Sequence, residues 1–240
     1  MIQPAKDDPV LIYSLMGMTA VTGIVDAVSF LALGHVFTAN MTGNVVLLGF
    51  AVARTPEVSV ARSLTALTAF LVGAAAGGRI MAKAGPESQL RAAITAFSVE
   101  IVFLIGAALS SVGYSGAVAL HLAKVYALIA FTAVAMGIRN AAVRRLAVPD
   151  LTTTVLTLTI TGLAADSSLA LGNNVRWQRR AISVAVMFGG AAVGAVVVRK
   201  SVLAALALSV LASAVCSLML VRSSRRVVQR SSPRDEMQSA

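Results

Sequence analysis

Six long apolar runs constrain this chain more than any other feature of its sequence. A bilayer with a hydrocarbon core of about 30 Å requires about 20 apolar residues for each helical crossing. Runs of roughly that length cover residues 10–33, 63–83, 92–112, 119–143, 181–198 and 202–221. The sequence therefore predicts an all-α, polytopic transmembrane helix bundle, since only helices or closed barrels can cross lipid with their backbone polar groups satisfied.

The charge content supports this prediction. Only 12% of the residues are charged and 58% are hydrophobic, whereas a soluble domain carries about 25% charged residues. The basic residues stand in short clusters between the apolar runs, such as Arg144-Arg145 and Arg199-Lys200. Topology-determining charges of membrane proteins are distributed in this way. Nucleic-acid binding proteins instead gather basic and aromatic residues on one face, so we expect no nucleic-acid partner.

Two further segments, 36–53 and 151–171, are apolar but begin with polar runs. They are either two additional crossings or polar, discontinuous membrane segments. Counting six crossings places more Lys and Arg residues on the inner side than counting eight, and the positive-inside rule favours the former. We therefore expect a cytoplasmic N-terminus (1–9), a transmembrane domain (10–222) and a disordered, basic cytoplasmic tail (223–240). The expected location is the bacterial inner (plasma) membrane.

The sequence also repeats itself weakly. Gly23-Ile-Val-Asp26-Ala27 has a counterpart in Gly137-Ile-Arg-Asn140-Ala141, and each is followed by a threonine-containing polar stretch. Gly73-x-x-x-Gly77 likewise matches Gly190-x-x-x-Gly194, and we expect both glycine pairs to mediate close helix contact. If each half, about 10–112 and 119–222, has three crossings, the second half is inverted relative to the first. Inverted repeats with polar interruptions are typical of secondary transporters.

Two of these motifs resemble those of a known family. Val25-Asp26-Ala-Val-Ser-Phe-Leu followed by Val36-Phe-Thr-Ala-Asn40-Met-Thr42-Gly43-Asn44 resembles the YoaK-like family of bacterial inner-membrane proteins, a domain of unknown function. Gly137-Ile-Arg-Asn140-Ala-Ala-Val-Arg144-Arg145-Leu resembles that family's second motif, although Leu158-Thr159 stands where the family often has Gly-Asn. The resemblance, over about 12–222, implies a small protein of about six spans without naming a substrate.

Asp26 is the clearest candidate for a binding residue. It lies about two thirds of the way along an apolar run, where an ionisable side chain is costly and usually faces a cavity or a partner. It is either a coupling-ion or proton site, or a structural acid paired with Arg139 or with backbone groups. The matching position of the second half, Asn140, would provide a neutral ligand.

The polar segments supply the other candidate ligands. A helix that starts near Thr42 inside the membrane would direct its free N–H groups toward a midplane site, and such a helix end attracts anions. We predict solute or ion binding by Asn40, Thr42 and Asn44, with Thr153 and Thr157 approaching from the second half. The alternative is that these residues only cap helices at the membrane surface.

Three more charged residues fall within or beside the apolar runs. Arg139 could bind an anionic substrate, but snorkelling to the cytoplasmic surface is the preferred interpretation. Glu100 has no evident partner in the sequence and is the candidate for a proton relay. Asp166 lies close enough to the basic 176–180 loop to form an ordinary ion pair.

Motifs of catalysis are missing from the sequence. It contains no HExxH, GxSxG, P-loop, CxxC or dinucleotide motif, and its two histidines and one cysteine are isolated. We therefore expect no enzyme, catalytic residue, metal or cofactor. The predicted function is a small secondary transporter or exporter of a small solute, coupled to protons or ions through Asp26. The alternative is a non-transporting scaffold or assembly partner, and the small-residue helix faces would also suit a homodimer.

Overall fold

A computed structural model of the chain describes residues 8–85, 88–148 and 156–230. Within these ranges the regular structure is entirely helical. Six helices are long and apolar enough to cross a membrane: α1 (Pro9–Ala32), α3 (Val60–Ala82), α4 (Gln89–Ser110), α5 (Leu122–Leu146), α7 (Trp177–Val198) and α8 (Val202–Arg230). Two short helices, α2 (Met41–Val52) and α6 (Leu156–Ala165), lie within the two segments that have polar beginnings. The predicted bundle of about six spans plus two short segments is confirmed.

The outer surface of the bundle is apolar. Large hydrophobic side chains are exposed on the outer helices, including Leu71 and Val72 on α3 and Phe188 and Val196 on α7. Their exposed fractions lie between 58% and 75%. A water-soluble protein would cover such helices with charged residues, so this surface faces lipid, and the chain is a multi-pass membrane protein.

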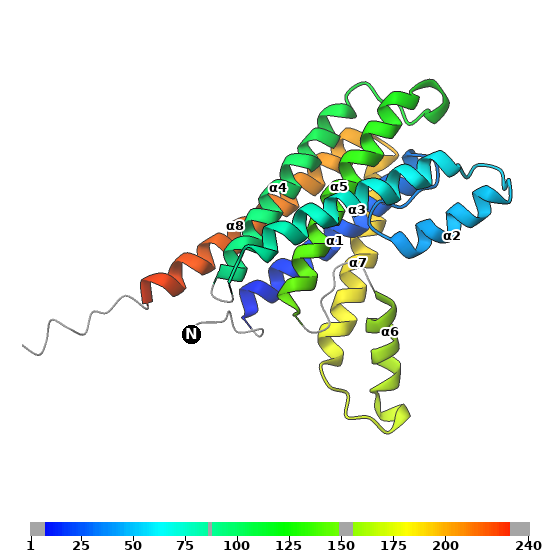
Figure 1. Ribbon diagram of the computed structural model, residues 1–240. Coiled ribbons are helices and arrows are strands. Elements are labelled where there is room, and N and C mark those ends of the chain that lie inside the picture. Colours follow the sequence, from blue (N-terminus) through cyan, green and yellow to red (C-terminus); the bar gives the residue numbers. More distant parts are fainter. Residues whose placement is uncertain (1–7, 86–87, 149–155, 231–240) are drawn as a thin grey trace, which may run out of the picture.

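The start of α1 is fixed by a capping residue. Asp8 begins α1 because its carboxylate accepts a hydrogen bond from the Val10 amide at 2.9 Å, and Pro9 occupies the first helical position. At the other terminus, α8 continues to Arg230, and residues 231–240 of the expected tail lie outside the described residues. Basic residues near a helix C-terminus favour the helical state through the macrodipole, which the apolar pattern alone does not reveal. Figure 1 shows this extension beyond the other helices.

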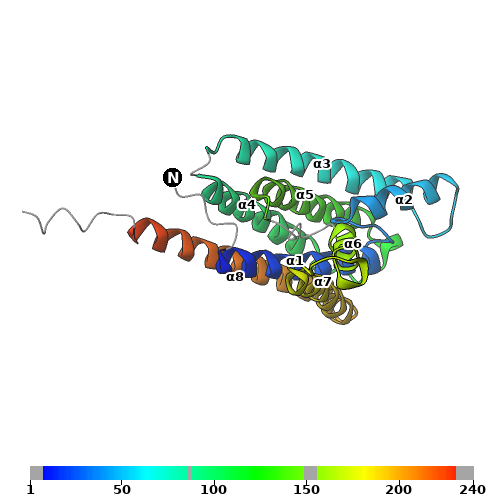
Figure 2. The same ribbon diagram turned by 90° about the horizontal axis from the view of Figure 1, so that it is seen from below.

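The six long helices form two groups that do not follow the order of the chain. One group contains α3, α4 and α5, and the other contains α1, α7 and α8. Figure 2 shows the two groups on opposite sides of the bundle. They meet mainly where α4 packs against α8, while α2 lies against α3 and α6 against α7. Each group therefore combines helices from both halves of the sequence.

Glycines allow the closest helix crossings within each group. A Cβ atom on Gly73 or Gly77 of α3 would collide with the α5 backbone at Val134 or Ile138. On α7, a Cβ on Gly190 or Gly194 would collide with the α1 backbone at Ala20 or Ile24. The predicted close contacts at both glycine pairs are confirmed.

The helices that receive these glycine pairs carry a glycine at the same crossing. Gly137 of α5 approaches the backbone of α3 at Phe70 and Ala74. Gly23 of α1 approaches the backbone of α7 at Met187 and Ala191. Both crossings are therefore backbone-to-backbone contacts with glycine on each side.

Candidate functional site

A buried ion pair lies where the two helix groups meet. Arg139 on α5 and Glu100 on α4 both have side chains that are 0% exposed. The Arg139 Nε atom donates to Glu100 Oε2 at 3.0 Å, and Nη2 donates to Oε1. The contact is bidentate, which is the geometry that matches a guanidinium to a carboxylate best.

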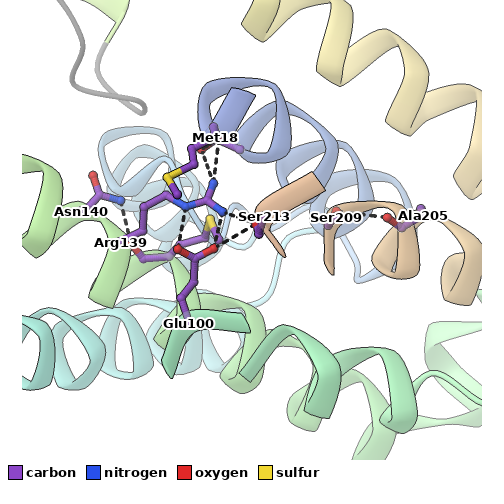
Figure 3. A network of polar contacts seen from close by, with 9 residues as sticks. Met18, Glu100, Arg139, Asn140, Ala205, Ser209 and Ser213 are labelled. Atoms are coloured by element: carbon purple, nitrogen blue, oxygen red, sulfur yellow. Dashed lines mark hydrogen bonds and ion pairs between the residues drawn. The ribbon is translucent and has the colours of Figure 1, made fainter. Parts of the chain in front are cut away.

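Arg139 also reaches across to the opposite group of helices (Figure 3). Its Nη1 atom donates to the Met18 carbonyl at 2.7 Å and to Thr22 Oγ1 at 3.1 Å, both on α1. Its Nη2 atom donates to Ser213 Oγ on α8 at 2.9 Å. With the two bonds to Glu100, these contacts equal the five N–H groups of a guanidinium. Arg139 thus joins four helices.

These contacts change three expectations. Snorkelling of Arg139 is wrong, because its side chain is fully buried and hydrogen-bonded in the protein interior. An anionic substrate finds no free N–H on Arg139 in this conformation and could bind only by displacing existing acceptors. Glu100 has a partner that sequence spacing did not reveal, since 39 residues separate it from Arg139. Its role in proton relay stays a prediction.

Asp26 occupies a second polar site farther along α1. The residue is 8% exposed, and its Oδ1 atom accepts a hydrogen bond from the Ala39 amide at 3.1 Å. The amides of Thr38 and Asn40 also interact with this carboxyl group. Among the described residues, no ion pair involves Asp26. Of the structural alternatives, the backbone partner is therefore correct, and the pairing with Arg139 is wrong.

The segment bound by Asp26 is the turn that leads into α2. The chain reverses after α1 at Gly34 and His35, whose φ angles are +87° and +57°. Arg62 at the start of α3 donates from Nε to the Gly34 carbonyl at 3.1 Å. The turn is thus fixed at both ends, by Asp26 from α1 and by Arg62 from α3.

The predicted cluster at residues 40–44 is divided between two environments. Asn40 is exposed and begins α2, with its side chain accepting from the Gly43 amide at 3.2 Å. Asn44 is 1% exposed; its amide group accepts from the Phe37 N–H at 3.4 Å and donates to the Ser63 carbonyl at 3.3 Å. Thr42 is exposed on α2. Capping by Asn40 is confirmed, while ligand binding by the cluster stays a prediction.

The corresponding residues of the second half are less closely grouped. Asn140 is half-buried and donates to the Met136 carbonyl of its own helix at 2.8 Å. Thr157 is exposed on α6, and Thr153 lies outside the described residues. Asp166 forms the predicted ion pair with Arg180, with Oδ2 and Nη1 2.6 Å apart. Within the described ranges, the two halves therefore do not present matching ligands.

Sequence reasoning did not identify the Thr22 and Ser213 hydroxyls, or the backbone carbonyl of Ser63, as members of these sites. A buried hydroxyl gives only a weak signal in an apolar helix, because serine and threonine are common there as helix-contact residues. The Met18 carbonyl could not be identified from the sequence, because every residue has a backbone carbonyl. Among the described residues, no cluster of three His, Cys, Asp or Glu side chains could hold a metal ion.

Outside the spans, Tyr114 closes the end of α1. Its hydroxyl donates to the Ala32 carbonyl, which is one of the free carbonyls at the helix C-terminus. Burial raises the pKa of the Tyr114 hydroxyl, and the nearby Arg62 charge opposes this shift. The neutral hydroxyl is the form that donates this bond, so Tyr114 couples the loop after α4 to α1.

Comparison with known proteins agrees with this architecture. The UPF0700 transmembrane protein YoaK of Bacillus subtilis (strain 168) is 39% identical over 155 residues, which are 65% of this chain and 65% of that protein. No solved structure matches. Residues 14–219 match the family described as protein of unknown function (DUF1275), a range that includes the Asp26 and Arg139–Glu100 sites. This multi-pass membrane protein therefore belongs to the DUF1275 family.

Proposed function

We propose that this protein is a small secondary transporter or exporter that moves a small solute across the bacterial inner membrane. The observation that carries the proposal is the exchange of helices between the two groups: α1 packs with α7 and α8, as α5 packs with α3 and α4. Two interlocked groups can rock against each other about a buried interface, which is the usual basis of alternating access.

The glycine crossings support an origin of these groups in an inverted repeat. Gly23 meets Met187 and Ala191, and Gly137 meets Phe70 and Ala74. The glycines are 114 positions apart (137 − 23), and the partners are 117 apart (187 − 70 and 191 − 74). The same contact thus recurs once in each group. An odd number of crossings in each half then gives the halves opposite orientations.

Buried charged groups in the bundle suit a coupled transporter. Asp26 has a backbone partner and no ion pair among the described residues, and such a carboxylate is costly inside a membrane unless an ion or proton binds it. We therefore propose Asp26 as the coupling site. The hydrogen bonds of Arg139 to α1 and α8, which join the two groups, would hold the closed conformation. On this proposal the protein is not an enzyme.

Transport in sealed vesicles tests the proposal. Wild-type protein should move at least one member of a panel of small solutes when a proton gradient is imposed, and Asp26→Asn should abolish that coupling. Asp166→Asn is a matched control, because it makes the same chemical change at a surface ion pair. The alternative of a scaffold or assembly partner would be favoured if no solute moves and Asp26→Asn leaves cellular phenotypes unchanged.

A further inference from the structure

Basic residues gather at one end of the group formed by α3, α4 and α5. A Cβ on Gly73 would meet Val134 and one on Gly77 would meet Ile138, so α3 and α5 run parallel and end on the same side of the bundle. Only residues 83–88 connect α3 to α4, which therefore starts on that side too (Figure 2). The basic rim, as we call this set, consists of Arg79, Lys83, Arg91, Arg144 and Arg145.

The charges of the basic rim are not balanced within the protein. All five residues are exposed, and among the described residues none of their side chains has a hydrogen-bond or ion-pair partner. Asp8 lies at the same end of the bundle, but its carboxylate already accepts from the Val10 amide at 2.9 Å and from Ser223 Oγ at 3.3 Å. Glu87 and Asp150, outside the described residues, could together neutralise at most two of the five charges.

Helix dipoles account for only part of this arrangement. Lys83, Arg144 and Arg145 follow or end helices, where the macrodipole favours a positive charge. Arg91 instead lies in the first turn of α4, where a positive charge is unfavourable, and that turn contains no acidic residue. An anion bound from outside the chain would offset both the dipole and the neighbouring cations.

Cations at the opposite end of the same helices are used differently. Arg62, at the start of α3, donates to the Gly34 carbonyl at 3.1 Å. Lys124, at the start of α5, donates from Nζ to the Val112 carbonyl at 2.6 Å. These two side chains hold loops of the protein in place, whereas those of the basic rim have no such internal role.

The rim residues of α3 and α4 continue faces that lie against lipid. Val72 is 59% exposed, and Arg79 and Lys83 follow it on the same face of α3, close to two and three turns later. On α4, Val102 is 65% exposed and lies about three turns after Arg91, again on one face. An apolar face that ends in cations matches a lipid, whose acyl chains lie beside its charged headgroup.

We propose that the basic rim is a binding surface for anionic phospholipids, such as phosphatidylglycerol, in the adjacent leaflet. The guanidinium groups of Arg79 and Arg91 donate to the phosphate oxygens, and the acyl chains lie along Val72 and Val102. The positive-inside rule explains why cations stand on one side of the membrane, but it requires no lipid binding by the folded protein. The proposal does not depend on the proposed transport function.

Titration with lipid tests the proposal on the full chain, purified in neutral detergent. Native mass spectrometry counts the phosphatidylglycerol molecules that remain bound, and phosphatidylcholine with the same acyl chains is the reference because its headgroup has no net charge. Each basic residue near an anionic lipid contributes about a fivefold change in affinity. The wild-type protein should therefore bind phosphatidylglycerol at least about tenfold more tightly than phosphatidylcholine. Equal binding of the two lipids overturns the proposal.

Two double variants locate the binding surface. Arg79→Gln with Arg91→Gln should weaken binding of phosphatidylglycerol about 25-fold, which is about fivefold for each charge. Arg199→Gln with Lys200→Gln is the matched control, since it removes two exposed charges beside Val202 at the opposite end of the bundle. The control should keep the wild-type affinity. Equal losses in both double variants would mean that the lipid responds only to net charge, and the rim would not be its site.

Two further measurements complete the test. The rim variant should keep the wild-type Tm in neutral detergent, because its side chains have no partner among the described residues, and a clear fall in Tm would contradict a free binding surface. Glycerophosphoglycerol, which is the same headgroup without acyl chains, should not displace the lipid at equal concentration. If it does, the rim binds soluble anions rather than lipid. None of these measurements requires a transported solute, so a failure of the proposed function leaves their outcome unchanged.

Discussion

Arg139 on α5 holds Glu100 on α4 in a bidentate contact at 0% exposure, and the same guanidinium donates to α1 and α8. The ion pair lies within one group of helices, whereas the other three hydrogen bonds cross to the second group. A single side chain therefore links the two groups at the centre of the bundle. Any movement of one group against the other must break these three bonds or carry Arg139 with it.

The first prediction concerns the two charges. Arg139→Met should leave the Glu100 carboxylate buried without a counter-charge, and Glu100→Leu should leave the guanidinium in the same state. Loss of one partner of a buried ion pair costs about 3–5 kcal/mol of folding free energy. The double variant removes both charges and should cost clearly less than the sum of the single variants. Unfolding of the purified wild-type protein and the three variants in detergent micelles gives the free energies of unfolding for this double-mutant cycle.

Asp166 and Arg180 provide the control for this cycle. The Asp166 side chain is 52% exposed, and an exposed ion pair contributes about 0–1 kcal/mol. Alanine substitutions of both residues should therefore show little coupling. If the coupling energy of Arg139 and Glu100 is equally small, the buried ion pair does not stabilise the packing of α4 against α5.

The second prediction concerns the glycine crossings. Gly137→Ala and Gly23→Ala place a Cβ against the backbone of α3 and α7, so each pair of helices must separate. Such overpacking typically costs about 1–3 kcal/mol. If the two crossings are equivalent, the two variants should lower the midpoint of unfolding, Tm, by similar amounts.

Neighbouring glycines separate this effect from helix propensity. A Cβ on Gly78 or Gly189 would meet nothing within 4 Å. Gly78→Ala and Gly189→Ala should therefore stabilise the protein slightly, by about 1 kcal/mol or less, because alanine favours a helix more than glycine does. Destabilisation in these two variants as well would mean that the close crossings are not the cause.

The third prediction separates the structural role of Asp26 from its proposed coupling role. An asparagine at this position retains a carbonyl oxygen that can accept from the Ala39 amide, so Asp26→Asn should keep Tm near the wild-type value. Asp26→Leu loses the acceptor and should be destabilised by about 1–3 kcal/mol. Both variants should lose proton-driven transport, since neither side chain can exchange a proton. Asp26→Asn with full coupling would exclude Asp26 as the coupling site.

The number of spans could be predicted because each apolar run is long enough to cross lipid. The prediction for Asp26 was incomplete, since the sequence offered both Arg139 and backbone groups as partners and only the fold shows Ala39. The prediction for Arg139 failed for a physical reason. Snorkelling was inferred from its place near the end of an apolar run, but the helix continues beyond that run to Leu146, so Arg139 lies inside α5.

The orientation of the spans gives the last prediction. With six crossings, one span separates the N-terminus from Glu57 in the loop before α3, and four separate it from Val175 before α7. Reporter enzymes fused after these two residues should therefore lie on opposite sides of the membrane, with the fusion at 57 outside if the N-terminus is cytoplasmic. If α2 and α6 were full crossings, both reporters would lie on the same side. Their lengths of 12 and 10 residues correspond to about 18 and 15 Å of helix, which is too short for a hydrocarbon core of about 30 Å.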